Sequence, residues 1–307
     1  MHQIKSLEHS IRATLHYFDI FDHPLSLDEL WRYLYAFYAE DMRDVVHVLE
    51  RMDDVVRFGP YYVLKGREQI ADARRKRLML EEKFWGRVGD FRWLFAAAPF
   101  VKFVGVCNSL AYGNVHAGSD IDLFVIAEKG RLGSARFFMK VLTQLFGVRM
   151  HHDKKAMRFC LSFFVTDDAL DLQPLAHDFD PYLAYFVRTL VPVAGSKKLY
   201  IDFLRANEHW VAPYGVYYPR LERFKESAVA ENGKPQSIGR QSTWYNKNVE
   251  RFLFDYQHER DHRRVGQKSL EGTGVVMNER IFKCNEVDRR KEFADAFRKK
   301  LEILNML

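Results

Sequence analysis

The stretch Phe103-Val-Gly-Val-Cys-Asn-Ser-Leu-Ala-Tyr-Gly-Asn-Val-His-Ala-Gly-Ser-Asp-Ile-Asp-Leu-Phe-Val-Ile126 decides the fold. It contains two apolar strands, joined by a segment that starts at Asn108 and Ser109 and reaches Asp120 and Asp122. Residues i and i+2 of a strand point to the same face, so the two carboxylates are expected side by side. Like charges at close range repel, and burying them without a partner is costly. A divalent cation is the usual remedy, and one or two carboxylates with substrate phosphates commonly hold Mg²⁺.

The small-residue turn before Leu110 precedes an expected helix. The first N–H groups of a helix have no partner within the helix, and such groups suit phosphate. Asp-x-Asp by itself is also typical of a solvated strand end or turn. The combination of the turn, the spacing and the apolar strand over 123–127 favours a binding site.

These residues resemble the motif of the nucleotidyltransferase superfamily of DNA polymerase β, an apolar-Gly-(Gly/Ser) turn followed by Asp/Glu-x-Asp. Ten residues separate Ser109 from Asp120, within the range of that family. The resemblance implies that Asp120 and Asp122 are catalytic and hold Mg²⁺ or Mn²⁺. It implies that Ser109, with Asn108 and Ser119, binds a nucleoside triphosphate such as ATP. The wider chain looks like bacterial proteins that place this domain after a small winged-helix-like domain.

Two departures from the family pattern affect the expected site. Asn108 stands where the family has its first Gly, and Asn tolerates positive φ better than most residues. The family also takes a third carboxylate from a later strand, and the candidate strand over 157–166 contains no acid. Alternation places Arg158, Cys160, Ser162 and Phe164 on one face, so that Cys160 or Ser162 takes the place of the acid.

Acids that flank this strand are the other candidates for the third position: Asp153, Asp167 and Asp168. An incomplete metal site implies weak, altered or absent activity. His151-His152-Asp153 has the composition of a metal site, but adjacent histidines in a strand point to opposite faces, so a surface loop is expected there.

Composition places this chain of 307 residues, with 48% hydrophobic residues and 25 Phe, among globular proteins of two or three domains. The net charge of +6 is a weak indication of a polyanionic ligand. Three cysteines without metal-ligand spacing favour a reducing, cytoplasmic location. No secretion signal and no membrane span are expected, because no apolar run approaches the required length.

The predicted fold class is α+β. A polymerase-β-type core, a small mixed sheet with helices on one side, is expected between an N-terminal domain and a C-terminal region. We expect a winged-helix-like domain over 1–66, a connecting helix over 67–97, the nucleotidyltransferase domain over 98–215 and a mainly helical region over 216–307. Helices are expected in the later chain at about 134–146, 180–191, 197–206, 243–262 and 285–304, with a linker over 231–240.

The N-terminal domain is expected to contain three helices and a two-stranded wing over 55–64. Ser26-Leu-Asp-Glu29 is a capping-box pattern that starts the second helix. A winged helix commonly binds DNA, but the third helix, over 41–52, is rich in acids, whereas a recognition helix should be basic. We therefore favour a packing or dimerisation role and do not expect tight binding of duplex DNA.

Two further segments have alternative interpretations. Arg74-Arg-Lys-Arg77 predicts a solvated helix face, or else a contact with nucleic-acid phosphates. The aromatic stretch over 210–218 predicts core packing, or else stacking on a base.

The expected function is metal-dependent transfer of a nucleoside monophosphate from a nucleoside triphosphate to an acceptor hydroxyl, with release of pyrophosphate. A small molecule, a protein side chain and an RNA end are all open as acceptors. The alternatives are a catalytically impaired nucleotide-binding sensor or scaffold, which the missing acid favours, and a winged-helix DNA-binding regulator.

Overall fold

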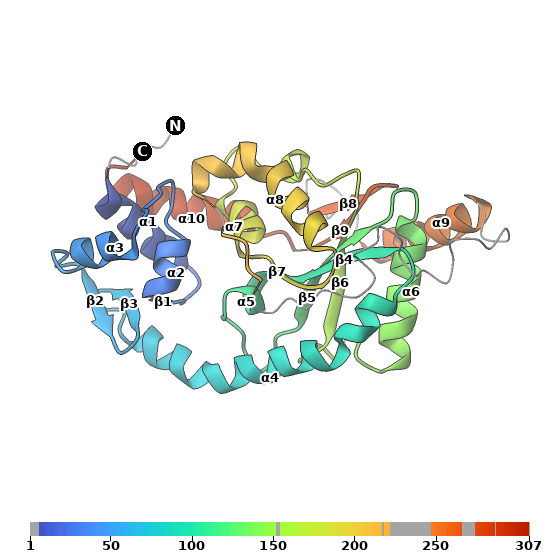
Figure 1. Ribbon diagram of the computed structural model, residues 1–307, viewed down its shortest axis with the longest axis horizontal. Helices are drawn as coiled ribbons and strands as arrows, with labels where there is room; N and C mark the ends of the chain where they lie inside the picture. The colour runs from blue at the N-terminus through green and yellow to red at the C-terminus, as the bar shows by residue number, and fades with distance from the viewer. Residues whose placement is uncertain are drawn as a thin grey trace.

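The computed structural model describes residues 6–151, 154–216, 218–221, 247–265, 274–285 and 287–306 (Figure 1). A small helical unit with its own sheet lies at one end, a six-stranded sheet covered by helices lies at the other, and one long helix runs between them. The predicted α+β class is confirmed. Within the described ranges, no helix combines the length and the apolar character needed to cross a membrane.

The N-terminal unit has the helices and the hairpin that the sequence predicts. Its elements are α1 (Leu7–Asp19), β1 (Leu25–Ser26), α2 (Leu27–Arg32), α3 (Met42–Leu49), β2 (Val55–Phe58) and β3 (Tyr61–Leu64). The three strands pair antiparallel in the order β1-β3-β2. The predicted capping box is confirmed: Ser26 Oγ accepts from the Glu29 N–H, and the Glu29 carboxylate accepts from the Ser26 N–H at 2.9 Å.

The apolar core of this unit is completed by helices from distant parts of the chain. Helices α7 (Pro181–Thr189) and α10 (Arg290–Ile303) both pack against α1 (Figure 1). The Tyr17 ring stacks on Tyr185 with centroids 4.4 Å apart and meets the edge of Phe297 at 5.2 Å. Large aromatic surfaces dominate the energetics of such cores. The N-terminal unit therefore depends on α7 and α10 for its packing.

The long helix α4 (Gln69–Ala97) carries the basic run, which divides into two kinds of residue. Arg74 is buried and binds the Glu29 carboxylate at 2.5 Å and the Pro24 carbonyl at 2.6 Å. Arg75 and Lys76 are exposed. The expectation of a solvated face is thus wrong for Arg74, whose charge fixes α4 to the N-terminal unit.

The larger sheet has the strand order β7-β4-β5-β6-β9-β8. Its strands are β4 (Val101–Val106), β5 (Ile121–Ala127), β6 (Phe159–Thr166), β7 (Val191–Gly195), β8 (Val275–Met277) and β9 (Ile281–Cys284). Among the described strands of this sheet, β5 and β6 pair in parallel and the other neighbours pair antiparallel. The sheet is therefore mixed, as expected.

Helices cover both faces of this sheet, whereas the family resemblance implies helices on one side. Helices α4 and α6 (Leu132–Leu145) pack on one face, and α7 and α8 (Lys197–Val211) pack on the other (Figure 1). The expectation of one covered face is wrong. The physical reason is that residues 123–127 are apolar and buried without alternation, which requires cover on both sides.

The region after residue 216 contributes two strands to the sheet in addition to helices α9 (Lys247–Arg264) and α10. We expect a mainly helical region here, and the strands β8 and β9 are not among the predicted elements. Strand β7, which follows α7 directly, is not predicted either. Strand β9 pairs with β6 through Phe282 opposite Phe164. The expected linker over 231–240 lies outside the described residues.

Candidate metal site

Asp120 and Asp122 lie at the start of β5, beside the parallel strand β6. The register of the pair makes Cys160 the direct partner of Asp122. A carboxylate oxygen of each aspartate and the Sγ atom of Cys160 all lie within 4.8 Å of one another. The prediction that the two carboxylates lie close enough to share a cation is therefore confirmed, with Cys160 as a third neighbouring donor.

A bulge in β6 decides which side chains share the face of Cys160. Asp122 pairs with Cys160 but Phe124 pairs with Phe163, so β6 contains one extra residue between the two pairs. Phe163 packs against Phe124 on the α7–α8 face, with ring centroids 5.1 Å apart, while Phe164 belongs to the core on the α4–α6 face. The simple alternation that placed Phe164 with Cys160 is wrong, because it assumes a regular strand.

Of the other candidates for the third position, Ser162 adjoins this cluster, whereas the described acids that flank β6 are not part of it. Ser162 hydrogen-bonds to the Cys160 thiol. Asp167 and Asp168 follow the far end of β6, where Asp167 forms an ion pair with Lys102 and Asp168 accepts from Thr166 Oγ1 at 2.6 Å. The remaining candidate, at position 153, lies outside the described residues.

The environment of the carboxylates disfavours their charged forms. Burial, and after it the charge of Asp120, raises the pKa of Asp122 to about 7, although hydrogen bonds with Asn108 and Cys160 oppose the shift. Burial also raises the pKa of Asp120, and the charge of Lys155 partly offsets this change. A cation that binds next to such a pair favours the ionised carboxylates, so it removes the unfavourable energy of their charges.

Neither carboxylate forms an ion pair within the described ranges of the chain, although other buried acids there do. Glu29 pairs with Arg74 at 2.5 Å, and burial alone would raise its pKa, but Arg74 lowers it to about 2. Asp180 pairs with Arg290 at 2.7 Å. In the described ranges, the two acids of the candidate site thus lack an ion-pair partner like those of Glu29 and Asp180.

Asn108 opens the turn between β4 and β5 with φ of +55°. The prediction that Asn accommodates a positive φ in place of the family's Gly is confirmed. The short helix α5 (Asn108–Ala111) begins at this residue, and the Cys107 N–H donates to the Asp122 carbonyl at 3.1 Å. The backbone itself therefore holds the turn against the strand that carries the acids.

The two serines assigned to nucleotide binding occupy the ends of the connecting segment. Ser109 lies in α5, and its carbonyl accepts from the Asn114 N–H at 2.7 Å. Ser119 directly precedes Asp120, and its Oγ accepts from the His116 N–H at 2.9 Å. Ser119 thus closes a turn before the acids, and phosphate binding by either serine stays a prediction.

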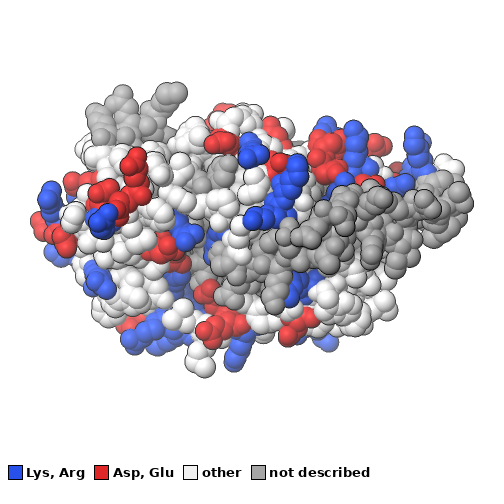
Figure 2. Space-filling view, viewed as in Figure 1, with Lys and Arg blue, Asp and Glu red and all other residues white. Residues whose placement is uncertain are grey.

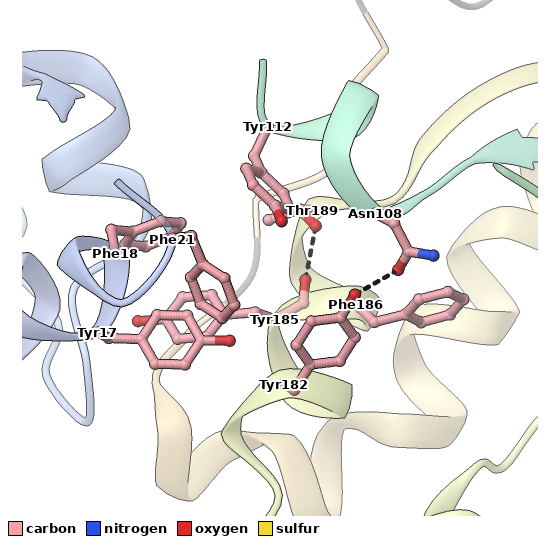
Figure 3. A pocket seen from close by; sticks show the side chains of 9 residues that line it. All are labelled: Tyr17, Phe18, Phe21, Asn108, Tyr112, Tyr182, Tyr185, Phe186 and Thr189. Carbon is pink, nitrogen blue, oxygen red and sulfur yellow. Dashed lines mark hydrogen bonds between the residues drawn. The ribbon is translucent and has the colours of Figure 1, made fainter. Parts of the chain in front are cut away.

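Tyr182 of α7 links the site to an aromatic cavity (Figure 3). Its hydroxyl donates to Asn108 Oδ1 at 3.3 Å. The cavity is walled by aromatic side chains of α1 and α7 and by Tyr112, and the volume open to the centre of a water molecule is about 10 Å³. That volume suits about one water molecule. Sequence patterns missed Tyr182, since the approach of α7 is a long-range contact.

The segment between Ser109 and Asp120 is anchored by the N-terminal unit and α4. Asn114 Nδ2 donates to the Phe21 carbonyl at 2.9 Å, and the Arg77 guanidinium donates to Asn114 Oδ1. Asn114 is only 6% exposed. Arg77 therefore positions the connecting segment, which is a structural role that neither interpretation of the basic run includes.

Two other predicted segments can be placed. Trp210 is buried and its indole N–H donates to Asn207 Oδ1 at 2.9 Å, so it packs in the core and offers no free face to a base. His151 is exposed and forms an isolated bridge with Lys154. The next two positions, 152 and 153, lie outside the described residues.

Surface charge on the N-terminal unit is mixed. Figure 2 shows acidic and basic side chains interspersed over the described part of this face, without a broad basic field. In α3, Arg43 forms an ion pair with Asp41, the residue that caps the helix. The expectation that the unit does not bind duplex DNA tightly stays a prediction.

No family model, no curated protein and no solved structure matches this chain.

Proposed function

We propose that this chain is a metal-dependent nucleotidyltransferase with a polymerase-β-type core. One observation carries the proposal: two partly buried carboxylates and a thiol lie within 4.8 Å of one another, and neither acid has an ion-pair partner in the described ranges. Such a pair is stabilised by a divalent cation and disfavoured without one. The Asn108–Ser109 turn, held against β5, supports a phosphate site beside that cation.

The residues divide the chemistry between them. A bound divalent cation would neutralise negative charge on the phosphates. Asp120 and Asp122 would hold it, and Ser109 with the N–H groups of the turn would hydrogen-bond the phosphate tail. The acceptor hydroxyl oxygen forms a bond to the α-phosphorus, the bond from that phosphorus to the bridging oxygen breaks, pyrophosphate leaves, and the hydroxyl proton passes to solvent.

A second candidate function is a nucleotide-binding sensor or scaffold that lacks catalysis. Cys160 favours this alternative, because its neutral thiol occupies the position expected for the third acid. We propose a cytoplasmic location for either function, since none of the three cysteines forms a disulfide, which fits a reducing compartment. The N-terminal unit is proposed to be a winged-helix-like packing module.

The test combines binding and turnover. The full chain is incubated with each nucleoside triphosphate and Mg²⁺ or Mn²⁺, and both calorimetric binding and pyrophosphate release are measured. The double substitution Asp120→Asn, Asp122→Asn should abolish metal-dependent binding. The control, Asp168→Asn, removes an acid at the far end of β6 and should retain it.

The outcomes separate the candidates. Metal-dependent binding with pyrophosphate release supports a transferase, and binding without release supports a sensor. Failure of the wild-type chain to bind any nucleoside triphosphate in the presence of metal contradicts both.

A further inference from the structure

We infer that the cluster of Asp120, Asp122 and Cys160 binds a thiophilic divalent cation, of the Zn²⁺, Co²⁺ or Cd²⁺ type, more tightly than Mg²⁺. The inference deepens the proposed function and rests on it only for the role of the ion, since the binding itself is measured without nucleotide. The inference depends on Cys160, whose thiol is the soft donor of the cluster.

Cys160 differs from the other two cysteines in what surrounds it. Cys107 and Cys284 each belong to an apolar cluster of the core. Cys160 is 7% exposed and belongs to none of the apolar clusters in the described ranges. Its thiol faces Asp120 and Asp122 instead. A thiol that only filled space would be placed among apolar side chains. The Cys160 thiol instead hydrogen-bonds with both carboxylates, as a third polar group of the cluster.

The geometry allows all three donors to reach one ion. Zn–S bonds are about 2.3 Å and Zn–O bonds about 2.1 Å long, so two donors on one ion are at most about 4.4 Å apart. The donor atoms here lie within 4.8 Å of one another, so small side-chain rotations bring them into range. The parallel pairing of β5 and β6 fixes the backbones of Asp122 and Cys160 as direct neighbours.

The donor set selects the class of ion. Mg²⁺ requires oxygen ligands in near-octahedral geometry, whereas a thiolate selects softer ions such as Zn²⁺. Binding breaks the Sγ–H bond of Cys160 and forms an Sγ–metal bond, and the proton leaves to solvent. Three protein donors leave a coordination position open, which is the arrangement of a catalytic zinc site and leaves room for a phosphate oxygen.

The experiment titrates the full chain, without nucleotide, with Cd²⁺ and follows the thiolate-to-metal charge-transfer absorption in the ultraviolet. The wild-type chain should show a band that saturates at one ion per chain. Cys160→Ser should lose the band and weaken Cd²⁺ binding by at least about tenfold, because even residues outside the ligand set cost about 10–100-fold. Cys284→Ser is the matched control, a buried cysteine of the apolar cluster on the α4–α6 face, outside the proposed donor set, and should keep the band.

Cys160→Asp provides a gain-of-function arm. It should lose the Cd²⁺ band and bind Mg²⁺ and Mn²⁺ more tightly than the wild-type chain does. A wild-type chain without a saturable band, or a band that persists in Cys160→Ser, overturns the inference. If Mg²⁺ binding nevertheless depends on Asp120 and Asp122, the proposed function survives that result. A band that depends on Cys160 in a chain that binds no nucleotide supports the inference and removes the proposed function.

Discussion

Replacing Asp122 by Asn should make the metal-free protein more stable at alkaline pH. Burial, with the Asp120 charge second, raises the pKa of Asp122 from its ordinary 3.8 to about 7. One pKa unit corresponds to about 1.4 kcal/mol, so a shift of about three units corresponds to about 4 kcal/mol. Because the carboxylate is only partly buried, solvent screening reduces this figure to about 2–4 kcal/mol.

The sign follows from which state holds the proton. Below pH 3.8 the carboxyl group is protonated in both states and has no effect on stability. Between pH 3.8 and about 7 the unfolded chain is ionised while the folded chain keeps the proton, so the free energy of unfolding falls as pH rises. Above the folded pKa the full penalty is present in the wild-type chain and absent from Asp122→Asn.

Urea denaturation with a chelator at mildly acidic and at alkaline pH measures the difference. The advantage of Asp122→Asn over the wild-type chain should grow with pH and reach about 2–4 kcal/mol at the alkaline limit. Added cation should stabilise the wild-type chain more than the variant, because the variant has lost a ligand.

Asp168→Asn is the matched contrast. The hydrogen bond from Thr166, and then Lys129 and Arg280, lower the pKa of Asp168, so its removal should not stabilise the protein at any pH. If Asp122→Asn is no more stable than the wild-type chain at alkaline pH, the two acids are not held in an uncompensated charged site and the reasoning fails.

Three other predictions follow from described contacts. Ser109→Ala should weaken triphosphate binding by about 1.5–3 kcal/mol, the value of a hydrogen bond to a charged group, and unchanged affinity in calorimetry would contradict its role. Arg74→Ala should lower the free energy of unfolding by about 3–5 kcal/mol because it leaves Glu29 buried without its cation, whereas the exposed Arg75→Ala should change it by less than about 0.5 kcal/mol. A gel mobility shift with duplex DNA in physiological salt should show no complex at nanomolar protein, and a salt-sensitive complex would favour the DNA-binding regulator.

Local patterns predicted the features that depend on a few neighbouring residues. The i, i+2 spacing of Asp120 and Asp122 predicted their proximity, and Asn108 was predicted to accept a positive φ. The capping box of Ser26 and Glu29 was also correct. In each case the physical cause lies within a few residues of the motif, where the sequence can be interpreted directly.

The sequence also contains a pattern that indicates helices on both faces of the sheet. The prediction of helices on one side followed the family resemblance instead. Residues 123–127 are uniformly apolar, and such a run predicts a strand covered on both sides. A strand with one solvated face would alternate polar and apolar residues. For the cover of the sheet, the apolar run therefore gives the correct prediction and the family resemblance does not.

The contacts that surround the site were beyond local patterns. The bulge in β6, which places Cys160 opposite Asp122, has no sequence signature in this strand. Arg74 meets Glu29 across 45 positions of the chain, and Asn114 meets Phe21 across 93. Strands β8 and β9 have only 3 and 4 residues, and their identity as strands depends on the partner they pair with.

The packing of α10 against α1 has a consequence for how this protein is synthesised. Asp19 and Lys300, which contact each other at 3.3 Å, are 281 positions apart. At about 5–20 residues per second, a ribosome needs roughly 15–60 s to extend the chain from one to the other. During that interval Tyr17 and Tyr35 lack the Phe297 ring against which both pack. The N-terminal unit is thus synthesised before the helix that completes its core, and these aromatic side chains gain their last packing partner only when α10 has been made.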